Sequence, residues 1–425
     1  MQKQNVISVL KERGFIDALT SPEIEKIVEN PIKLYCGFDP TSDSLHLGNL
    51  VGIIALAWFK RFGHHPIALV GGATGMIGDP SGKSAERNLL SEEALRANAA
   101  SLDHLLNTLL NRDGNERLPV LNNYDWISKF SLLDFLRDVG KHFRLGVMLA
   151  KDMVRTRLIT EEGMSFTEFS YQLLQGYDFY YLLKHHGVVL QVGGSDQWGN
   201  ITAGTDLIRK LNGEQQAFGL TFPLLTKSDG TKFGKTEKGA IWLSPDKLSP
   251  YEFYQYLYRV SDDDVVKLLR VLTFIPIEEI RQLEQQLNRE ECAPNALQKR
   301  LAEEATRFVH GEEGLRSALE VTVNLAPGKE TVLDVATLEA TSNNLPSVAF
   351  PLSEIIDCKL VDCLFNAKLF ASKGDARRMI LNGGVYINNQ KIGDANYVLS
   401  QKDLIEGRML LLAAGKKNKV IVRVE

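Results

Sequence analysis

Two stretches that lie far apart in the chain combine imidazole, lysine and glycine in ways that suit an anion. The first, DPTSDSLHLGN at residues 39–49, follows the buried-looking run LYCGF. Its Asp and Ser residues favour the start of a helix with His46 and Gly48 in the first turn. Because the amino end of a helix carries partial positive charge, this stretch is a candidate phosphate site. The same residues also suit a simple helix cap.

The second stretch, KSDGTKFGKT at residues 227–236, places Lys232 and Lys235 beside Gly230 and Gly234. Glycine makes such a loop adaptable, and lysine supplies movable positive charge. Such a loop can close on a polyphosphate and stabilise charge developing there. A surface hairpin that happens to carry lysines is the alternative interpretation.

A third glycine-rich stretch, GGATGMIGDPSGKS at residues 71–84, ends like the phosphate-binding motif G-x-x-x-x-G-K-[ST]. The first glycine of that motif would have to be residue 77, which is Ile77, and Gly78 lies one position out of frame. The mismatch argues against a P-loop nucleotide triphosphatase. Lys83 and Arg87 remain as two cations that either approach a triphosphate or belong to a solvated charged loop.

Polar residues also mark a strand end and one face of a helix. In GGSDQWGN, residues 193–200, Asp196 follows two glycines, where a carboxylate suits ribose hydroxyls or caps the next helix. Tyr171, Gln175 and Asp178 are spaced i, i+4 and i+7, which places them on one helix face. This face predicts either a pocket for a small polar molecule or an ordinary solvent-facing stripe.

The elements that must position these residues alternate between short apolar runs and longer helical patterns. The alternation predicts an α/β fold with a Rossmann-like parallel sheet, whose ligands bind beyond the carboxyl ends of the strands. The runs that predict strands are 34–36, 67–70, 119–121 and 188–192, and the patterns that predict helices include 45–62 and 92–110.

Composition changes along the chain predict further domains. A helical pattern starts near residue 249, a polar and loose stretch follows it, and a small α+β pattern ends the chain. We therefore expect a catalytic domain, an α-helical domain, a linker and a terminal domain, at residues 1–245, 246–325, 326–350 and 351–425.

The overall composition is that of an ordinary globular protein. Of 425 residues, 44% are hydrophobic and 24% are charged, and the formal net charge is −4. The part from Pro351 onward has twelve Lys and Arg against eight Asp and Glu, so this part suits a local polyanion contact. The polar start, the absence of long apolar runs and four scattered cysteines predict a cytoplasmic protein without membrane span, disulfide framework or structural zinc.

Taken together and in order, these stretches resemble the bacterial tyrosyl-tRNA synthetases, a family of class I aminoacyl-tRNA synthetases. HLGN stands where the family has His-x-Gly-His, and KFGKT stands where it has Lys-Met-Ser-Lys-Ser. LYCGFDPT, GDPSGK, NNYDW, FLRDVGKHF, SYQLLQGYDF and GGSDQWGN are also similar to this family, and SKGDARRMILNGGVYINN resembles its S-four-type RNA-binding domain. The resemblance covers essentially the whole chain.

The resemblance implies an activity and its reactants. Tyrosine's carboxylate attacks the α-phosphate of ATP, with Mg²⁺ assisting, and the tyrosyl group then passes to the 3′-terminal adenosine of tRNA(Tyr). The family also suggests a homodimer. Two rivals stay in view: a tryptophanyl-tRNA synthetase, which Tyr35 and Asp178 disfavour because they suit a phenol, and a non-catalytic RNA-binding or splicing factor built on a synthetase body.

The resemblance also implies site residues at matching positions. The tyrosine-binding residues are Tyr35, Asp79, Asn123, Tyr171, Gln175, Asp178 and Gln191. The ATP-binding residues are Gly37, Asp39, Gly48, Asn49, Gly194, Asp196, Gln197 and Lys235. The catalytic residues are Thr41, His46, Lys83, Arg87, Lys232, Lys235 and Thr236, and the RNA-binding residues are Lys373, Arg377 and Arg378.

The chain departs from the family consensus in both motifs. Asn49 stands in place of the second His, and Asn can donate a hydrogen bond but cannot be cationic. In the second motif Phe233 replaces Met and Gly234 replaces the first Ser. The two lysines and a terminal hydroxyl remain, so the charge of the second motif is retained.

Overall fold

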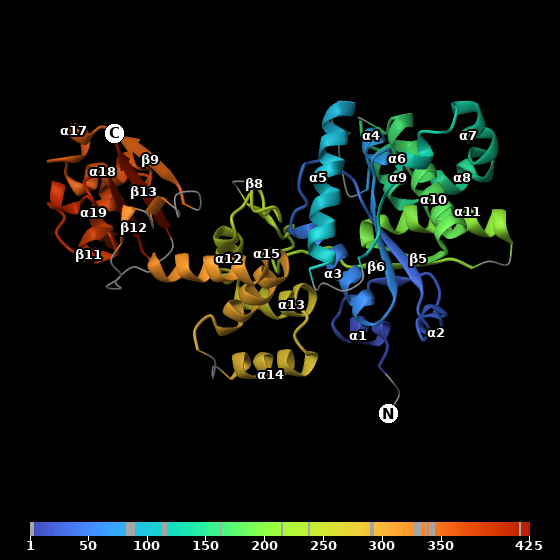
Figure 1. Cartoon of the computed structure of the whole chain (residues 1–425), viewed down its shortest axis with the longest axis horizontal. Coiled ribbons are helices and arrows are strands. Elements are labelled where there is room, and N and C mark those ends of the chain that lie inside the picture. The colour runs from blue at the N-terminus through green and yellow to red at the C-terminus, as the bar shows by residue number, and fades with distance from the viewer. Residues whose placement is uncertain are drawn as a thin grey trace. The chain divides into compact units, whose positions relative to one another are not determined.

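The computed structural model describes most of the chain, in two compact units (Figure 1). The first unit comprises residues 1–247 with 256–309, and the second comprises residues 248–255 with 310–425. The described residues are 4–81, 90–112, 117–161, 163–213, 216–236, 239–289, 293–325, 333–335, 338–339, 345–415 and 418–425.

A six-stranded sheet organises the first unit. Its spatial order is β1-β6-β5-β2-β3-β4, and every neighbouring pair is parallel except β1 with β6. The predicted parallel sheet is thus confirmed. The strands are β1 (Ala18–Leu19), β2 (Lys33–Phe38), β3 (His65–Val70), β4 (Val120–Asn122), β5 (Val188–Gly194) and β6 (Phe218–Phe222).

The order of the strands reverses between β2 and β5. From β2 the chain builds outward through β3 to β4, then returns to place β5 on the other side of β2 and continues to β6. The crossovers on the two sides of this point lead away from each other, which leaves a crevice at the carboxyl ends of β2 and β5. A ligand site is expected at this crevice.

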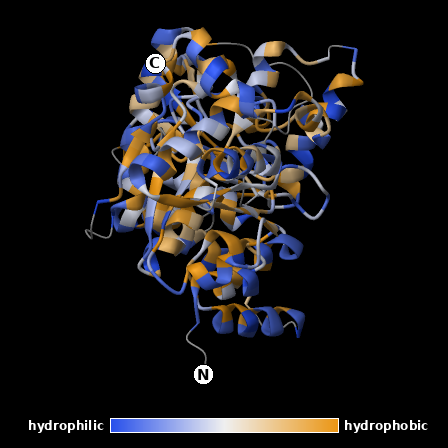
Figure 2. Ribbon diagram, turned by 90° about the vertical axis from the view of Figure 1, so that its right-hand side faces the viewer, coloured by the Kyte–Doolittle hydropathy of each residue, from blue (hydrophilic) through white to orange (hydrophobic). Residues whose placement is uncertain are grey.

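Helices cover both faces of the sheet. α3 (Leu47–Arg61) and α5 (Glu92–Leu110) pack against each other on one face, and α10 (Phe166–His186) and α11 (Trp198–Asn212) do so on the other (Figure 1). α3 is nearly all apolar and is buried along most of its length. Most of the other helices carry both hydrophobic and hydrophilic residues, as amphipathic surface helices do (Figure 2).

Shorter elements complete the first unit. They are α1 (Val6–Glu12), α2 (Ile24–Ile27), α4 (Thr74–Ile77), α6 (Tyr124–Ile127), α7 (Leu132–Asp138), α8 (Leu145–Leu149), α9 (Asp152–Leu158) and the hairpin of β7 (Lys235–Thr236) and β8 (Gly239–Ala240). No described helix combines the length and the apolar character needed to cross a membrane.

The helical part after the sheet begins where the sequence predicted it. It contains α12 (Pro250–Tyr258), α13 (Asp262–Leu272), α14 (Ile277–Asn288) and α15 (Ala296–Asn324). α15 is interrupted at Gly311, whose φ of 75° is not helical. Strand β6 was not predicted, because a short apolar run has no periodicity that separates a strand from a helix.

The terminal part is an antiparallel sheet with one parallel edge, packed on helices. Its strand order is β11-β10-β12-β13-β9, and only β9 with β13 is parallel. Apolar residues of α18, α19 and the strands share one core. The elements are β9 (Ser347–Phe350), α17 (Leu352–Ile355), α18 (Leu360–Asn366), α19 (Lys373–Leu381), β10 (Val385–Ile387), β11 (Gln390–Ile392), β12 (Met409–Ala414) and β13 (Asn418–Val424). Strand β9 lies in the stretch predicted as linker, because backbone pairing with β13 rather than side-chain pattern defines it.

Arg13 joins the N-terminal segment to the end of α13. Its guanidinium donates to the carbonyl oxygens of Arg270, Ile275, Thr273 and Leu269, at 2.7, 2.7, 2.6 and 3.3 Å. The residue is only 2% exposed. It therefore satisfies carbonyl groups that the end of a helix leaves without intrahelical partners.

We expect Arg13→Met to destabilise the first unit by about 3 kcal/mol, because it leaves buried carbonyl groups without donors. Urea unfolding measures the loss. The control is Lys11→Met on the same N-terminal segment, which removes an exposed ion pair with Glu25 and should cost well under about 1 kcal/mol. Equal losses for the two variants would contradict this role of Arg13.

Candidate active site

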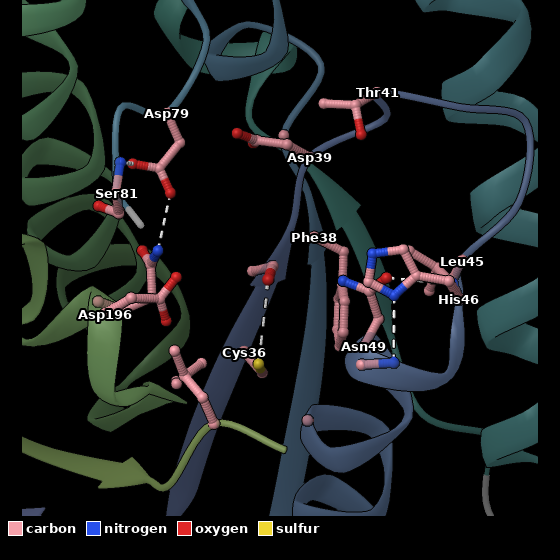
Figure 3. Close-up of a pocket in the computed structure, with 18 of the residues that line it drawn as sticks. Cys36, Phe38, Asp39, Thr41, Leu45, His46, Asn49, Asp79, Ser81 and Asp196 are labelled. Carbon is pink, nitrogen blue, oxygen red and sulfur yellow. Dashed lines mark hydrogen bonds between the residues drawn. The ribbon is translucent and has the colours of Figure 1, made fainter. Parts of the chain in front are cut away.

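A cavity of about 570 Å³ lies at the carboxyl ends of β2 and β5 (Figure 3). It occupies the crevice where the strand order reverses. The predicted site residues that line it are Tyr35, Gly37, Asp39, Thr41, His46, Gly48, Asn49, Asp79, Asn123, Tyr171, Gln175, Asp178, Gln191, Gly194, Asp196, Gln197 and Lys232.

Asp178 is a buried carboxylate in the wall of this cavity. It accepts hydrogen bonds from Asn123 Nδ2 at 2.9 Å and from Trp126 Nε1 at 2.8 Å. Burial raises the pKa of Asp178 to about 7, while these two donors oppose the rise and the charge of Asp39 adds to it. Asp178 therefore changes its charge near neutral pH.

Three buried polar atoms of the cavity wall have no hydrogen-bond partner among the described residues. They are the hydroxyl of Tyr35 and the side-chain oxygens of Gln175 and Gln191. Tyr35 on β2 and Gln191 on β5 are register neighbours in the sheet. Burial and the nearby Asp178 carboxylate raise the pKa of Tyr35 well above its usual value, so its hydroxyl keeps its proton. Because unpaired buried polar groups are costly, these atoms indicate where a polar ligand binds.

Asp39 lies where the β2 strand ends and is held by two hydroxyl donors. Tyr171 donates to Oδ2 at 2.7 Å, and Thr74 donates to Oδ1 at 2.8 Å. A Cβ at Gly71 would lie 1.9 Å from Asp39 Oδ1, so only glycine allows this approach. These contacts fix Asp39 and the inner helix α10 relative to each other.

Asp79 and Asp196 lie close together on the β5 side of the cavity (Figure 3). Asp79 accepts from Gln197 Nε2 at 2.7 Å and from the Ser81 amide at 3.0 Å. Burial and then Asp79 raise the pKa of Asp196, and Lys232 opposes the rise. At Gly194 a Cβ would lie 2.5 Å from Asp196 Oδ1, so the glycine gives this carboxylate its room.

His46 and Asn49 form a reciprocal cap at the start of α3. His46 Nδ1 accepts from the Gly48 amide at 3.1 Å, and the His46 amide donates to Asn49 Oδ1 at 3.1 Å. Because Nδ1 accepts, the proton of a neutral His46 is on Nε2. The structure thereby gives Asn49 a role that the family resemblance did not supply. It holds the end of the helix that faces the cavity.

The lysine-bearing stretch lies directly beside this helix start. A Cβ at Gly234 would lie 3.1 Å from the Leu47 Cβ, the Gly234 carbonyl accepts from the Ile241 amide at 2.9 Å, and the Ile241 carbonyl accepts from the Leu47 amide at 2.8 Å. Lys232 lines the cavity. The two candidate phosphate-binding stretches are thus neighbours in space, although they lie far apart in sequence.

Some predicted residues cannot be placed at the cavity. Lys83 and Arg87 lie outside the described residues. Lys235 and Thr236 belong to β7, and their side chains are outside the described part of the structure.

The three predicted RNA contacts lie on α19 of the second unit and are exposed. Lys373 pairs with Asp362 at 2.6 Å. Arg378 pairs with Asp375 on its own helix.

Sequence reasoning missed Trp126, Thr74 and Cys36. Trp126 and Thr74 hold the carboxylates of Asp178 and Asp39. Cys36 lines the cavity, and burial raises the pKa of its thiol to about 12, so it is neutral at physiological pH. The run NNYDW carried the signal for Trp126, since it follows a predicted strand end.

The cavity as a whole suits an elongated molecule with different ends. One part offers a carboxylate, a neutral hydroxyl and amide oxygens, which bind hydrogen-bond donors and ammonium groups. Another part offers the positive end of α3 and Lys232, which bind anions. Nothing in this arrangement requires the protein to form a covalent bond with its ligand, because positioning and charge neutralisation suffice for phosphoryl chemistry.

Comparisons with known proteins agree with this geometry. Residues 27–326 match the family model of class I tRNA synthetases for tryptophan and tyrosine (W and Y), and residues 337–422 match the C-terminal domain model of tyrosine–tRNA ligases. A tyrosine–tRNA ligase of Protochlamydia amoebophila is 59% identical over 422 residues, which cover 99% of each chain.

A second relative and a solved structure are also similar to this chain. A chloroplastic/mitochondrial tyrosine–tRNA ligase of Arabidopsis thaliana is 51% identical, over 99% of this chain and 84% of the relative. The crystal structure of a C-terminally truncated mitochondrial tyrosyl-tRNA synthetase from Aspergillus nidulans superposes with a TM-score of 0.66 at 32% identity. That match covers 75% of this chain and 93% of the other.

We expect Trp126→Phe to raise the pKa of Asp178 further, by roughly one unit, because it removes a donor to the ionised carboxylate. Difference infrared spectroscopy of the protonated carboxyl band measures the pKa, and Asp178→Asn identifies the band. Trp58→Phe is the control, since the buried Nε1 of Trp58 has no partner among the described residues. A pKa that stays unchanged in Trp126→Phe would show that this hydrogen bond does not stabilise the carboxylate.

Proposed function

The chain belongs to the class I tRNA synthetases of the tryptophan and tyrosine group, and we infer that it is a tyrosine–tRNA ligase. It activates L-tyrosine with ATP to give tyrosyl-adenylate and pyrophosphate. It then transfers the tyrosyl group to the 3′-terminal adenosine of tRNA(Tyr). The observation that carries this assignment is the pairing of the Asp178 carboxylate with the unpartnered Tyr35 hydroxyl in one cavity wall.

This pair suits a phenol. A phenol hydroxyl donates to the Asp178 carboxylate and accepts from the Tyr35 hydroxyl, so both buried groups gain a partner. The benzene ring of phenylalanine or the carbocycle of tryptophan offers neither, and would leave these groups desolvated and unpaired. The tryptophan-specific rival is therefore disfavoured by the cavity itself.

The other tyrosine contacts follow from the remaining acceptors. Gln175 has an unpartnered oxygen and Asp79 is an ionisable carboxylate, and both suit the ammonium group of the substrate. Tyr171 is bound to Asp39, and the pair joins the tyrosine part of the cavity to the nucleotide part. Asn123 holds Asp178, and Gln191 adds a second acceptor beside Tyr35.

ATP binds across β2, β5 and the start of α3 in this proposal. Asp39 and Asp196 contact the nucleoside, and Gly37, Gly48 and Gly194 leave room for it. A Cβ at Gly37 would meet no atom within 4 Å, so this position is open to the cavity. Asn49 keeps the helix end in place, and Gln197 fixes Asp79.

The reaction needs charge neutralisation more than proton transfer. The tyrosine carboxylate forms a bond to the α-phosphorus, and the bond to the bridging oxygen breaks as pyrophosphate leaves with the electron pair. His46 donates from Nε2 to a phosphate oxygen, and Thr41 adds a hydroxyl. Lys232 neutralises charge on the leaving group, and we assign the same role to Lys83, Arg87, Lys235 and Thr236.

Mg²⁺ accompanies ATP in this proposal without a dedicated set of protein ligands. Among the described residues, no three His, Cys, Asp or Glu side chains gather in a way that could hold a metal ion. We expect phosphate oxygens and water to supply its ligands, because Mg²⁺ usually keeps several waters and binds through substrate phosphates. The ion neutralises phosphate charge when it is bound.

The terminal unit serves tRNA binding. We propose the domain layout 1–245, 246–325, 326–350 and 351–425, with the last part as an S-four-type RNA-binding domain and with β9 at the end of the linker segment. Lys373, Arg377 and Arg378 lie exposed on α19, as phosphate contacts require. We assign the protein to the cytoplasm, although the Arabidopsis relative is named for organelles.

A homodimer is supported by exposed apolar residues between β4 and the start of α10. Such a concentration of exposed apolar side chains marks a protein interface. Ile159 is 86% exposed and Leu133 is 76% exposed. The exposed apolar residues of this segment are Leu132, Leu133, Leu136, Leu145, Val147, Leu149, Leu158, Ile159 and Phe166.

We expect the protein to sediment as a dimer and Ile159→Glu to sediment as a monomer at micromolar concentration, because a buried unpaired carboxylate opposes association. Analytical ultracentrifugation measures the mass. Leu381→Glu, at a 64% exposed leucine of the terminal unit, should remain dimeric. A dimer in the Ile159→Glu variant would place the interface elsewhere.

Amino-acid-dependent exchange of pyrophosphate into ATP tests the function directly. We expect exchange with tyrosine and not with phenylalanine or tryptophan. Tyrosine affinity should also fall by up to tenfold per pH unit below about 7, because protonation of Asp178 removes the acceptor for the phenol. Equilibrium dialysis from acid to neutral pH measures this dependence.

Asp178→Asn is the matched variant for this experiment. It should bind tyrosine at least tenfold more weakly, and the remaining affinity should not depend on pH near 7. Exchange with tryptophan, or with no amino acid, would overturn the assignment and favour the tryptophan enzyme or a non-catalytic RNA-binding protein. Unchanged tyrosine affinity in Asp178→Asn would refute the role of the carboxylate.

A further inference from the structure

The lysine-bearing loop, residues 226–236, is anchored at its base and exposed at its tip. Thr226 and Lys232 form an isolated antiparallel bridge, and the Lys227 amide donates to the Thr231 carbonyl at 2.8 Å. Gly230 turns the chain with a φ of 81°. Residues 228–232 are exposed. The loop is therefore a hydrogen-bonded hairpin with an exposed turn, and its direction depends on what holds its two ends.

One side chain of α12 holds the far end of this loop. The Tyr256 hydroxyl accepts a hydrogen bond from the Gly234 amide at 3.0 Å. Its ring packs edge-on against Phe233, with ring centroids 5.4 Å apart. Gly234 has a φ of 84°, and a Cβ there would lie 3.1 Å from the Cβ of Leu47, the first residue of α3. Tyr256 thus fixes the peptide that lies against the start of α3.

Two side chains of α13 hold the near end. Asp264 Oδ1 accepts from the Ser228 amide at 2.8 Å, and its Oδ2 accepts from the Ser261 hydroxyl at 2.8 Å. Lys267 Nζ donates to the Thr226 carbonyl at 2.9 Å. Both ends of the loop are therefore fixed by side chains from outside it, and the exposed Lys232 lies opposite Thr226 at the base of the turn.

We propose that Tyr256 is a positioning residue for adenylate formation, whose hydroxyl holds the lysine-bearing loop at the phosphate end of the cavity. The inference rests on the proposed function. Tyr256 is not among the described residues that line the cavity, so it acts through the loop and not on the substrate. The Gly234 amide lies between Lys232 and Lys235, so its orientation sets where the backbone of both lysines runs.

The hydroxyl and the ring of Tyr256 can be separated by experiment. Tyr256→Phe keeps the packing on Phe233 and removes the acceptor of the Gly234 amide. We expect the rate constant for tyrosyl-adenylate formation to fall about tenfold, as loss of one hydrogen bond implies. The dissociation constant of tyrosine should not change, since its contacts lie at Tyr35 and Asp178. Stopped-flow fluorescence with saturating tyrosine and varied ATP measures the first, and equilibrium dialysis measures the second.

Tyr258→Phe is the matched control, because it removes a hydroxyl from the same helix. It should form adenylate at the wild-type rate. A double-mutant cycle with Lys232→Ala then separates a positioning role from a general loss of stability. If Tyr256 acts through the loop, its substitution should have a smaller effect once Lys232 is absent.

Two results would overturn the proposal while the proposed function stands. They are a wild-type rate in Tyr256→Phe, and fully additive effects of Tyr256→Phe and Lys232→Ala. If the wild-type protein forms no adenylate from tyrosine and ATP, the proposed function fails and this inference fails with it.

Discussion

The reversal of strand order between β2 and β5 is the constraint on which the rest of the site depends. Crossovers lead away from this point on both sides, which leaves a crevice at the carboxyl ends of the two strands. The polar residues that follow each strand therefore meet in one cavity. Tyr35 and Gln191 are paired in register, and Asp39 and Asp196 lie just beyond the strand ends. The residues of the candidate site are thus far apart in the sequence but lie together at one edge of the sheet.

Within this cavity, satisfied and unsatisfied polar groups have different tasks. The carboxylates of Asp39 and Asp79 each have donors that hold them, and these bonds connect β2, β5 and α10 into a fixed wall. The hydroxyl of Tyr35 and the oxygen of Gln191 have none among the described residues. The fixed carboxylates keep the wall in place, and the unpaired atoms mark the positions where a bound molecule would supply hydrogen-bond partners.

Local pattern was sufficient to predict part of the site. Helical spacing alone placed Tyr171, Gln175 and Asp178 on one face, because a period of 3.6 residues depends only on neighbouring residues. The strand-end rule likewise located Asp196. The roles proposed for Tyr35 and Asp79 rest on the family resemblance alone, because nothing in their immediate sequence distinguishes a ligand contact from a core or turn residue.

Long-range contacts could not be predicted in the same way. Trp126 and Asp178 are 52 positions apart in sequence and meet only because α10 packs beside the β4 edge. The cap formed by His46 and Asn49 is local, and its three-residue spacing was visible, but the capping box is usually recognised from Ser or Thr with Glu. From the sequence, Asn49 stood out only as a position that cannot carry a positive charge. The structure shows that its side-chain oxygen accepts a hydrogen bond from the His46 amide.

The two departures in the second motif have the same kind of explanation. Phe233 is 6% exposed and packs on Tyr256, so the position requires an apolar side chain of some size and not Met in particular. Gly234 adopts a positive φ and lies against Leu47. A serine at this position would strain the backbone, and its Cβ would crowd Leu47. Each of the two residues fits its neighbours in this chain, so packing around the loop accounts for the departure from the consensus.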